Sequence, residues 1–492
     1  MQKPERLIGF VEVDDTNFPF EFDEKTFTLN LYPPSLETQD KKRFGFFDAM
    51  NNPAKNVFEW TPHKRICGVS FGGKANTDGI VFSNKSHYIL FDVLDMEANY
   101  NGFISYRVNW YFLYPEGIQP FEISAFRLSG STINYFYNPE IALQRKVEFA
   151  ENGTGLTGFS VSSADMHCSA DCGEYPLTDD ISAKITVHAY ATMHYQTASN
   201  PIDATSVFTT TFSRPLRHDE IDILIKAYEY SRLFFHYISY RRNIGLYDVD
   251  VCFLNKSNQQ EYNGLLVFKR QAQEETYEKA NQRILDYAVI GIHSAKLFSV
   301  IESNAFGYEH ICETIGDTHT YSLNRAFMIL SEFEREFRNI YGQDCIRSQE
   351  YQDVKRDILN MIDGIISASK GKRRSAAKEF RKYVEVHGVS IKLKLIHALN
   401  DCRLIMLPFV RTEYQGKFGE FEEVVKGIGA RMGEMRNGLA HSKLSLQFGS
   451  VNISDLKIVE KLLYAMRLKT ILHDTTIIQK GINNLFGGSV AL

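Results

Sequence analysis

The chain has 492 residues, of which 44% are hydrophobic and 23% charged, a balance typical of globular domains with substantial cores. This length exceeds that of one typical domain and predicts two or three. The net charge of −5 excludes a global positive field, so any contact with nucleic acid needs a local basic surface. No run of 18 or more apolar residues is present, which argues against a membrane-spanning helix.

The first residues and the cysteines indicate a cytoplasmic protein. The opening stretch, 1–6, lacks the apolar core of a secretory signal. The seven cysteines are odd in number and form no dense framework. We therefore expect reduced thiols and a cytoplasmic location.

Short alternating runs broken by turn residues fill the first part of the chain. Examples are 7–13, 26–32, 104–112 and 184–190. Several such runs separated by glycine- and proline-containing turns are typical of an antiparallel sandwich or barrel. Most of the aromatic surplus also lies before about residue 240, and aromatic rings pack well on a pleated surface. The sequence predicts a β-rich N-terminal domain over 1–215.

A small α+β connector is expected over 216–310. Residues 213–215, Ser-Arg-Pro, are predicted to break a strand, and a helical pattern follows with Asp219 as its N-cap. Two short strands are then predicted at 248–254 and 265–269.

Beyond the connector, apolar residues recur at helical spacing, as at Leu330, Phe333 and Phe337. Candidate helices are 281–303, 323–341, 351–369, 374–386, 391–406, 418–440 and 453–474. Short polar breaks join them, which favours antiparallel neighbours. The sequence predicts an all-α helical bundle over 311–492, and the fold class is α+β multidomain.

The principal candidate for chemistry is the stretch Arg436-Asn437-Gly438-Leu439-Ala440-His441. On a helix, Asn437 and His441 share one face, and Arg436 lies about 100° round. Histidine can accept and donate protons near neutral pH. The arginine fork holds phosphate oxygens and offsets charge in a transition state. Asparagine can orient the histidine or donate to phosphate, so the three side chains suit RNA cleavage without a metal or other cofactor.

One simpler interpretation stays open for this stretch, and a second arginine–histidine pair competes with it. Arg436 can be a solvated side chain, with Asn437-Gly438 ending a helix and His441 an ordinary partner of that turn. A second arginine–histidine pair, Arg381 and His387, also has a suitable spacing, but lysine follows its arginine where a small polar residue is preferred.

The motif Arg-Asn-x-x-Ala-His at 436–441, near the end of a helical C-terminal region, resembles that of the HEPN superfamily of ribonucleases. The resemblance covers about 310–485. Together with the β-rich N-terminal half, the layout resembles the ApeA family of bacterial anti-phage, or abortive-infection, proteins. One departure is that Ser442-Lys443-Leu444 follows the histidine, where some HEPN toxins carry a tyrosine.

This resemblance implies roles and partners. Arg436 would bind the scissile phosphate, His441 would act as general acid or base, and Asn437 would support them. It implies a homodimer through the HEPN bundle, with one composite cleft, and single-stranded RNA or tRNA loops as substrate. A phage-derived trigger would activate the enzyme.

The densest basic run contains Lys372, Arg373, Arg374 and Lys378. These side chains can bind the phosphates that flank the cut, which would make RNA binding sensitive to salt. A solvated helix start explains the run equally well.

The residues His167, Cys168 and Cys172 bring three zinc-ligand types together. A structural zinc site needs a fourth ligand, and His188 or His194 would have to supply it from a distant strand. We interpret the two thiols as bystanders on a surface loop and expect no metal.

The sequence therefore predicts a metal-independent endoribonuclease of anti-phage defence that the N-terminal domain regulates by sensing a trigger. The alternative is a HEPN module that binds a nucleotide, RNA or a partner without cleaving. A hydrolase in the β-rich part has no support, because no Ser/His/Asp or paired-acid grouping is evident there.

Overall fold

The computed structural model of the chain describes residues 7–13, 16–32, 65–76, 79–98, 104–115, 122–149, 156–163, 167–193, 202–254, 259–270, 275, 282–305, 307–342, 346–386, 389–415, 419–440, 449–488 and 490. The chain divides into two compact units. Unit 1 comprises 1–232 and 243–275, and unit 2 comprises 233–242 and 276–492. The connector expected over 216–310 is therefore divided between the two units.

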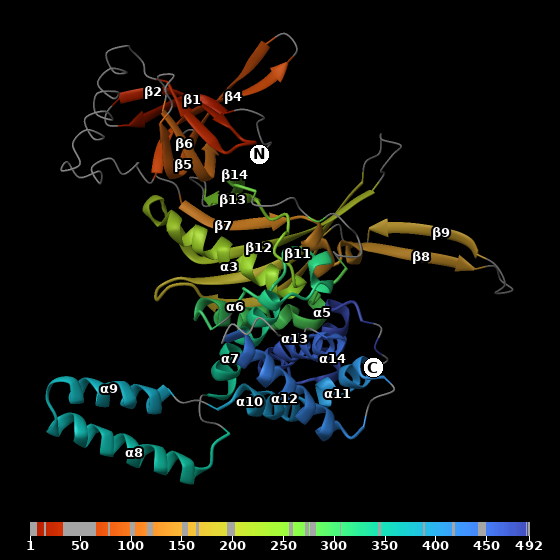
Figure 1. Cartoon of the computed structure of the whole chain (residues 1–492). Coiled ribbons are helices and arrows are strands. Elements are labelled where there is room, and N and C mark those ends of the chain that lie inside the picture. The colour runs from red at the N-terminus through yellow and green to blue at the C-terminus, as the bar shows by residue number, and fades with distance from the viewer. Residues whose placement is uncertain are drawn as a thin grey trace. The chain divides into compact units, whose positions relative to one another are not determined.

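Unit 1 is built from antiparallel strands, as the alternating sequence runs predict (Figure 1). The strands are β1 Leu7–Val13, β2 Thr16–Asp23, β3 Thr28–Leu31, β4 Arg65–Asn76, β5 Gly79–Ala98, β6 Ile104–Pro115, β7 Glu122–Ser129, β8 Leu143–Phe149, β9 Leu156–Ser163, β10 His167–Pro176, β11 Ser182–Met193, β12 Ile202–Arg217, β13 Asp248–Leu254 and β14 Gln260–Phe268. Short helices α2 Ser131–Phe136, η2 Pro139–Ala142 and η3 His218–Glu220 lie between strands, and α3 Ile221–Ser239 follows them.

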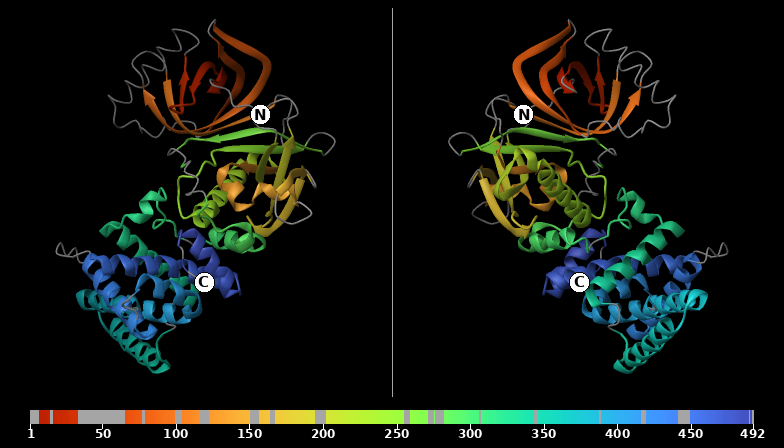
Figure 2. Two further views of the ribbon diagram at one scale, coloured as in Figure 1. Left: turned by 90° about the vertical axis from the view of Figure 1, so that its right-hand side faces the viewer. Right: turned by 90° about the vertical axis from the view of Figure 1, so that its left-hand side faces the viewer.

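Strands β1 to β6 close into a ring (Figure 2). The pairing runs β6-β3-β2-β1-β4-β5, and β5 pairs again with β6. Alternation puts Phe18, Phe20 and Phe22 of β2 on one side, and all three are buried. The ring of Phe22 contacts those of Phe91 and Tyr111, with centroids 5.1 and 5.2 Å away. Aromatic packing therefore fills the interior of the ring, in line with the aromatic surplus of the sequence.

The sheet continues from the ring through β6. Its order from there is β14, β13, β7, β12, β11 and β10, and β8 pairs with β9 separately. The prediction for 248–254 is confirmed by β13, whereas β14 begins five residues before its predicted start. The first half of β14 contains the polar residues Gln260, Glu261 and Asn263, so it lacks the hydrophobic pattern on which the strand prediction relies.

The strand break expected at 213–215 is wrong. Strand β12 runs through these residues to Arg217, and its register against β7 shifts between Thr211 and Leu216. Because the proline lies within this irregular stretch, its missing N–H interrupts no regular ladder. The expected N-cap at Asp219 is also wrong, since the Arg217 amide donates to Oε2 of Glu220 at 2.8 Å.

Unit 2 is helical, as predicted. Its elements are α5 Tyr287–Ile290, η4 Gly291–His293, α6 Ser294–Glu302, η5 Gly316–His319, α7 Leu323–Tyr341, α8 Gln349–Ala368, α9 Gly371–Val386, α10 Ile391–Asp401, α11 Arg403–Glu413, α12 Phe421–Ala440, α13 Ser450–Ile471 and α14 Thr475–Leu485. The predicted helix 281–303 begins only at Tyr287 and contains a 3-10 turn, and 391–406 is two helices that meet at Cys402. No helix among the described residues combines the length and the apolar character needed to cross a membrane.

Helix α13 lies at the centre of unit 2 and buries residues on all sides. Its charged groups are paired inside the bundle. Asp455 accepts from Nε and Nη2 of Arg431 at 2.7 and 2.8 Å, and Arg467 binds Glu336 at 2.6 Å. Glu460 binds Arg325 at 2.6 Å. Paired burial avoids the large cost of an isolated charge in the core.

Candidate functional site

Helix α12 carries the first part of the 436–441 motif. One stripe of the helix is buried, formed by Phe421, Val425, Ile428, Met432 and Met435. The helix continues to Ala440, so Asn437-Gly438 does not end it. The motif therefore begins on a regular helix, with Arg436 and Asn437 in its last two turns.

Two glycines bring α10 unusually close to α12. A Cβ at Gly429 would lie 2.9 Å from the Lys392 carbonyl oxygen and 3.0 Å from Cγ1 of Ile396. A Cβ at Gly433 would lie 3.3 Å from Cβ of Lys392. These glycines allow close helix packing, and they place the first turn of α10 beside the C-terminal part of α12.

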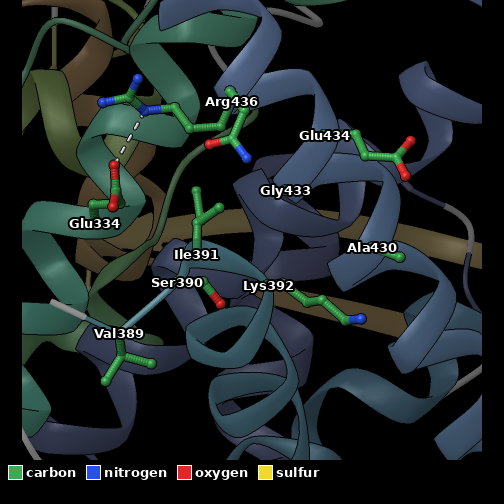
Figure 3. A pocket seen from close by; sticks show the side chains of 10 residues that line it. Glu334, Val389, Ser390, Ile391, Lys392, Ala430, Gly433, Glu434 and Arg436 are labelled. Atoms are coloured by element: carbon green, nitrogen blue, oxygen red, sulfur yellow. Dashed lines mark hydrogen bonds and ion pairs between the residues drawn. The ribbon is translucent and has the colours of Figure 1, made fainter.

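A pocket of about 450 Å³ opens where α7, α10 and α12 meet (Figure 3). Its lining residues are Glu334, Val389, Ser390, Ile391, Lys392, Ala430, Gly433, Glu434, Arg436 and Asn437. Two motif residues, Arg436 and Asn437, thus belong to one concave site. This volume falls within the range of small-ligand sites.

The Arg436 side chain is held on two sides. Its Nε donates to Oε2 of Glu334 at 3.1 Å, as Figure 3 shows, and its guanidinium carbon lies 5.2 Å from the centre of the Phe327 ring. The side chain is about one-quarter exposed. Both contacts orient the guanidinium while leaving part of it accessible from the pocket.

Glu334 also binds Lys394, with Nζ 3.3 Å from Oε1. One carboxylate therefore bridges a cation of α12 and a cation of α10. The exposed Lys392 adds a further positive charge to the pocket lining. A phosphate that entered this pocket would meet two cationic side chains, together with the positive end of the α10 dipole.

Sequence reasoning missed Glu334, Lys392 and Lys394. A signal for the lysines was present, because both lie in the first turn of α10, directly after its N-cap Ser390. Cations at a helix N-terminus oppose the helix dipole, so their placement there points to an anion nearby. Glu334 lies 102 positions from Arg436, and no local pattern connects the two.

The third motif residue, His441, lies outside the described residues, as does His387 of the second arginine–histidine pair. Arg381 of that pair binds Asp363 at 2.7 Å and Glu385 at 2.9 Å. Two carboxylates already engage this guanidinium, which suits a structural role on α9.

The structure does not bring the basic run into the pocket. Lys372, Arg373, Arg374 and Lys378 are exposed residues of α9, and none of them lines the pocket.

The three zinc-ligand candidates lie on strand β10, so their assignment to a surface loop is wrong. Among the described residues, no group of three or more His, Cys, Asp or Glu is arranged to hold a metal. His167 is exposed while Cys172 is fully buried, at a register shift opposite β11. Nε2 of His167 lies 3.1 Å from Nδ1 of His188, and burial lowers the pKa of His188. Within the described part of the chain, no cysteine sulfur joins His167 and His188 in a metal-binding group.

Comparisons with models of known protein families, with curated proteins and with solved structures find no match to this chain. The geometry of the pocket and its chemistry are therefore the basis for assigning a function.

Proposed function

We propose that the pocket beside Arg436 is the active site of a metal-independent HEPN-type endoribonuclease. The observation that carries the proposal is the shared placement of Arg436, Asn437 and Lys392 around one pocket. The helix that bears the first two continues to Ala440, the residue before His441. Two cations and an amide at one concave site suit a phosphodiester that gains charge during cleavage.

The proposed reaction is attack of an RNA 2′-hydroxyl on the adjacent phosphate. The bond between the 2′-oxygen and phosphorus forms, and the bond from phosphorus to the 5′-oxygen breaks. One proton leaves the 2′-hydroxyl and another reaches the departing 5′-oxygen, and the His441 imidazole is the group suited to these transfers. The products are a 2′,3′-cyclic phosphate and a 5′-hydroxyl. DNA is spared because it lacks the attacking hydroxyl.

Four residues that line the pocket then have roles. Arg436 binds the scissile phosphate, and Asn437 orients the imidazole or donates to phosphate. Lys392 attracts the RNA backbone through its exposed ammonium. The Glu334 carboxylate offers Arg436 anionic oxygens, as a phosphate does. When substrate binds, its phosphate replaces this carboxylate as the partner of Arg436.

In this proposal the protein is a cytoplasmic effector of anti-phage defence that acts as a homodimer through the helical bundle. Its substrate is cellular RNA, including tRNA loops, and unit 1 restrains the nuclease until a phage-derived trigger arrives. Truncation is a poor test of this restraint. Residues 233–242 belong to unit 2, and Tyr240 there donates to Glu460 inside the bundle, so removal of 1–310 would damage the bundle core.

The test is cleavage of tRNA and of single-stranded RNA by the purified full chain in the presence of a chelator, with and without lysate from phage-infected cells. We expect 2′,3′-cyclic phosphate ends and no cleavage of DNA. R436A and H441A should each reduce the rate at least about 100-fold, the usual scale for loss of acid–base or charge stabilisation.

Two matched variants control for nonspecific effects. Arg242 is also an arginine paired with a glutamate, at 3.4 Å from Glu313, and His473 is exposed. R242A and H473A should retain cleavage. Equal rates for R436A, H441A and these controls would refute the assigned site, and cleavage that stops with chelator would refute a metal-independent mechanism.

A second candidate function is a pocket that binds a nucleotide or RNA without cutting it. The ion pair between Glu334 and Arg436 favours it, because the cation is already neutralised and the pocket volume suits a small ligand. Growth of cells that express the wild type, R436A or H441A separates the two functions during phage challenge. Loss of toxicity in both variants favours the nuclease, and equal growth of all three favours the binder.

A further inference from the structure

Helix α9 carries a local excess of positive charge in a chain whose net charge is −5. Its sixteen residues include six basic and two acidic side chains. An excess of this kind supplies the local basic surface that a protein with an acidic overall charge needs for contact with nucleic acid. A solvated helix can also carry such charges, so the arrangement of the cations decides between the two interpretations.

Three of the cations, Arg374, Lys378 and Lys382, form one exposed row along α9, here called the basic stripe. They are spaced by four residues, so each step advances about 6 Å and turns only about 40° around the helix. The buried Ala377, together with Arg381, which pairs with α8, marks the side of α9 that packs on α8. Lys378 and Lys382 each follow one of these residues by one position, about 100° round, so α8 does not cover the basic stripe.

The cations of the basic stripe are not neutralised. None of the three side chains forms an ion pair or a hydrogen bond with another residue that the structure describes. By contrast, Arg381 of the same helix binds Asp363 at 2.7 Å and Glu385 at 2.9 Å. Three unpaired charges in one row are therefore available to an external anion.

The first turn of α9 adds to this positive charge. It contains Lys372 and Arg373 as well as Arg374, and it has no acidic residue. Cations at this end oppose the helix dipole, which lowers the stability of the helix on its own. An anion bound along α9 would offset this unfavourable interaction, whereas a solvated helix would retain it. The charge pattern therefore favours a bound polyanion over a solvated surface.

The basic stripe begins close to the pocket that contains Arg436. Helix α9 ends at Val386, and Val389 lines the pocket, so these two positions are at most about 11 Å apart. Lys382 lies about one turn before the end of α9, and Arg374 lies about 12 Å further along the helix. The other end of α9 points away from the rest of unit 2 (Figure 1). The row of positive charge therefore extends outward from the neighbourhood of the pocket.

We propose that the basic stripe binds the backbone of an unpaired RNA strand that continues from the Arg436 pocket, so that the substrate is a strand long enough to contact both. The pocket, of about 450 Å³, has room for a nucleotide but not for the width of a duplex. Contacts to phosphate carry no sequence information, so the basic stripe gives affinity for length rather than for sequence. This inference rests on the proposed function for the entry of the strand into the pocket.

The test is the affinity of the purified full chain for labelled single strands of deoxynucleotides, which lack the 2′-hydroxyl and are not cleaved. Fluorescence anisotropy is measured at several salt concentrations with strands of about 4 and about 16 nucleotides, the range of single-strand sites on other proteins. The wild type should bind the longer strand more tightly, with one strand per chain at saturation.

The variant K378A/K382A removes two of the proposed phosphate contacts. Each contributes about 0.7 to the slope of log K against log salt, so the slope should fall by about 1.4 and the affinity for the longer strand by about 25-fold at 0.1 M salt. The difference from the wild type should shrink toward none for the shorter strand. Alanine is a strong helix former, and circular dichroism establishes that α9 is retained.

Two further variants are matched controls. K378R/K382R keeps both charges and should bind the longer strand as the wild type does. K426A/K480A removes the same number of exposed lysines from α12 and α14, at positions that do not line the pocket, and should leave both affinities unchanged. R436A, in the pocket itself, should weaken the binding of both strands.

The outcomes separate this inference from the proposed function. Equal affinities of the wild type and K378A/K382A for the longer strand would overturn the basic stripe while leaving the pocket as an RNA site. A loss in K378A/K382A without a loss in R436A would refute the pocket as an RNA site, and with it the continuous strand. Binding of vesicles that contain an anionic lipid, lost in K378A/K382A, together with no binding of either strand, would assign the basic stripe to a membrane surface and overturn the proposal.

Discussion

Glu334 of α7 and Arg436 of α12, 102 positions apart in sequence, form an ion pair with 3.1 Å between Oε2 and Nε. The same carboxylate binds Lys394 of α10, so one acid connects the three helices around the pocket. Any anion that enters the pocket competes with this carboxylate for Arg436.

The first prediction follows from this competition. Replacing Glu334 by glutamine keeps the size of the side chain and removes the competing charge, so RNA should bind more tightly. We expect a two- to fivefold lower Kd, roughly the value of one partly exposed ion pair. Fluorescence anisotropy with a labelled oligonucleotide measures it. Glu413, which binds Lys457 and is similarly exposed, provides the control E413Q, for which affinity should not change. Weaker binding by E334Q would contradict competition.

The second prediction concerns the close contact of α10 and α12. G429A would push a methyl group against the backbone of α10, so the free energy of unfolding should fall by about 1–3 kcal/mol, as for other overpacked sites. Urea denaturation measures this loss. Gly364 is also helical, but nothing lies within 4 Å of the position of its Cβ. G364A should therefore stabilise by about 0.5–1 kcal/mol. An equal change in the free energy of unfolding for G429A and G364A would show that the packing of α10 against α12 does not require glycine at position 429.

The third prediction tests Lys392 as a phosphate contact. K392A should weaken RNA binding and reduce the slope of log K against log salt by about 0.7, the value for one phosphate of a single strand. Binding titrations at several salt concentrations supply the slope. Lys480 of α14 is exposed and does not line the pocket, so K480A should leave both quantities unchanged. An unchanged slope for K392A would remove this lysine from the site.

The fourth prediction concerns pH. His310 is buried, neither ring nitrogen makes a hydrogen bond to a described residue, and burial lowers its pKa to about 3. Between pH 6.5 and 3 the unfolded chain binds a proton there that the folded chain does not. The stability contribution of neutral His310 is therefore complete above pH 6.5. It falls as the pH drops, by at most about 1.4 kcal/mol per pH unit.

The measurement is the difference in unfolding free energy between the wild type and H310Q at several pH values from 4 to 7.5. Glu332, whose pKa burial raises to about 7, contributes the opposite slope, but it is present in both proteins. The unfolding free energy of the wild type minus that of H310Q should therefore decrease as the pH falls. A flat difference would mean that His310 is not held neutral.

Much of the fold is readable from local patterns. The alternation in 7–13 and 248–254 predicts β1 and β13 with their observed bounds. The stripe containing Phe333 and Phe337 predicts α7 in the same way. Closure of the ring is not readable, because β3 pairs with β6 and β1 pairs with β4 across long stretches of sequence. Strand β12 passes through its proline because an irregular register absorbs the missing donor.

The candidate site, too, is predictable from the sequence only where local patterns determine it. Local spacing suffices to select Arg436 and Asn437, and the four glycines of α12 lower its helix propensity when the helix is considered alone. Only the packed structure reveals that Gly429 and Gly433 allow α10 to pack closely against α12, which places Lys392 at the pocket. Glu334 comes from a third helix, and nothing in the local sequence connects it to the motif.

Strand β6 gives unit 1 a mechanical property. Its first part, Ile104–Arg107, pairs with β3, and its later part, Trp110–Leu113, pairs on that same edge with β14, while β5 occupies the other edge. At the changeover, the Val108 amide donates to the Phe27 carbonyl, and the Lys269 amide donates to the Asn109 carbonyl. A pulling force or a denaturant that frees β6 must therefore dismantle both neighbourhoods at once. Unit 1 should therefore unfold in one cooperative step, without an intermediate in which one of its parts stays folded.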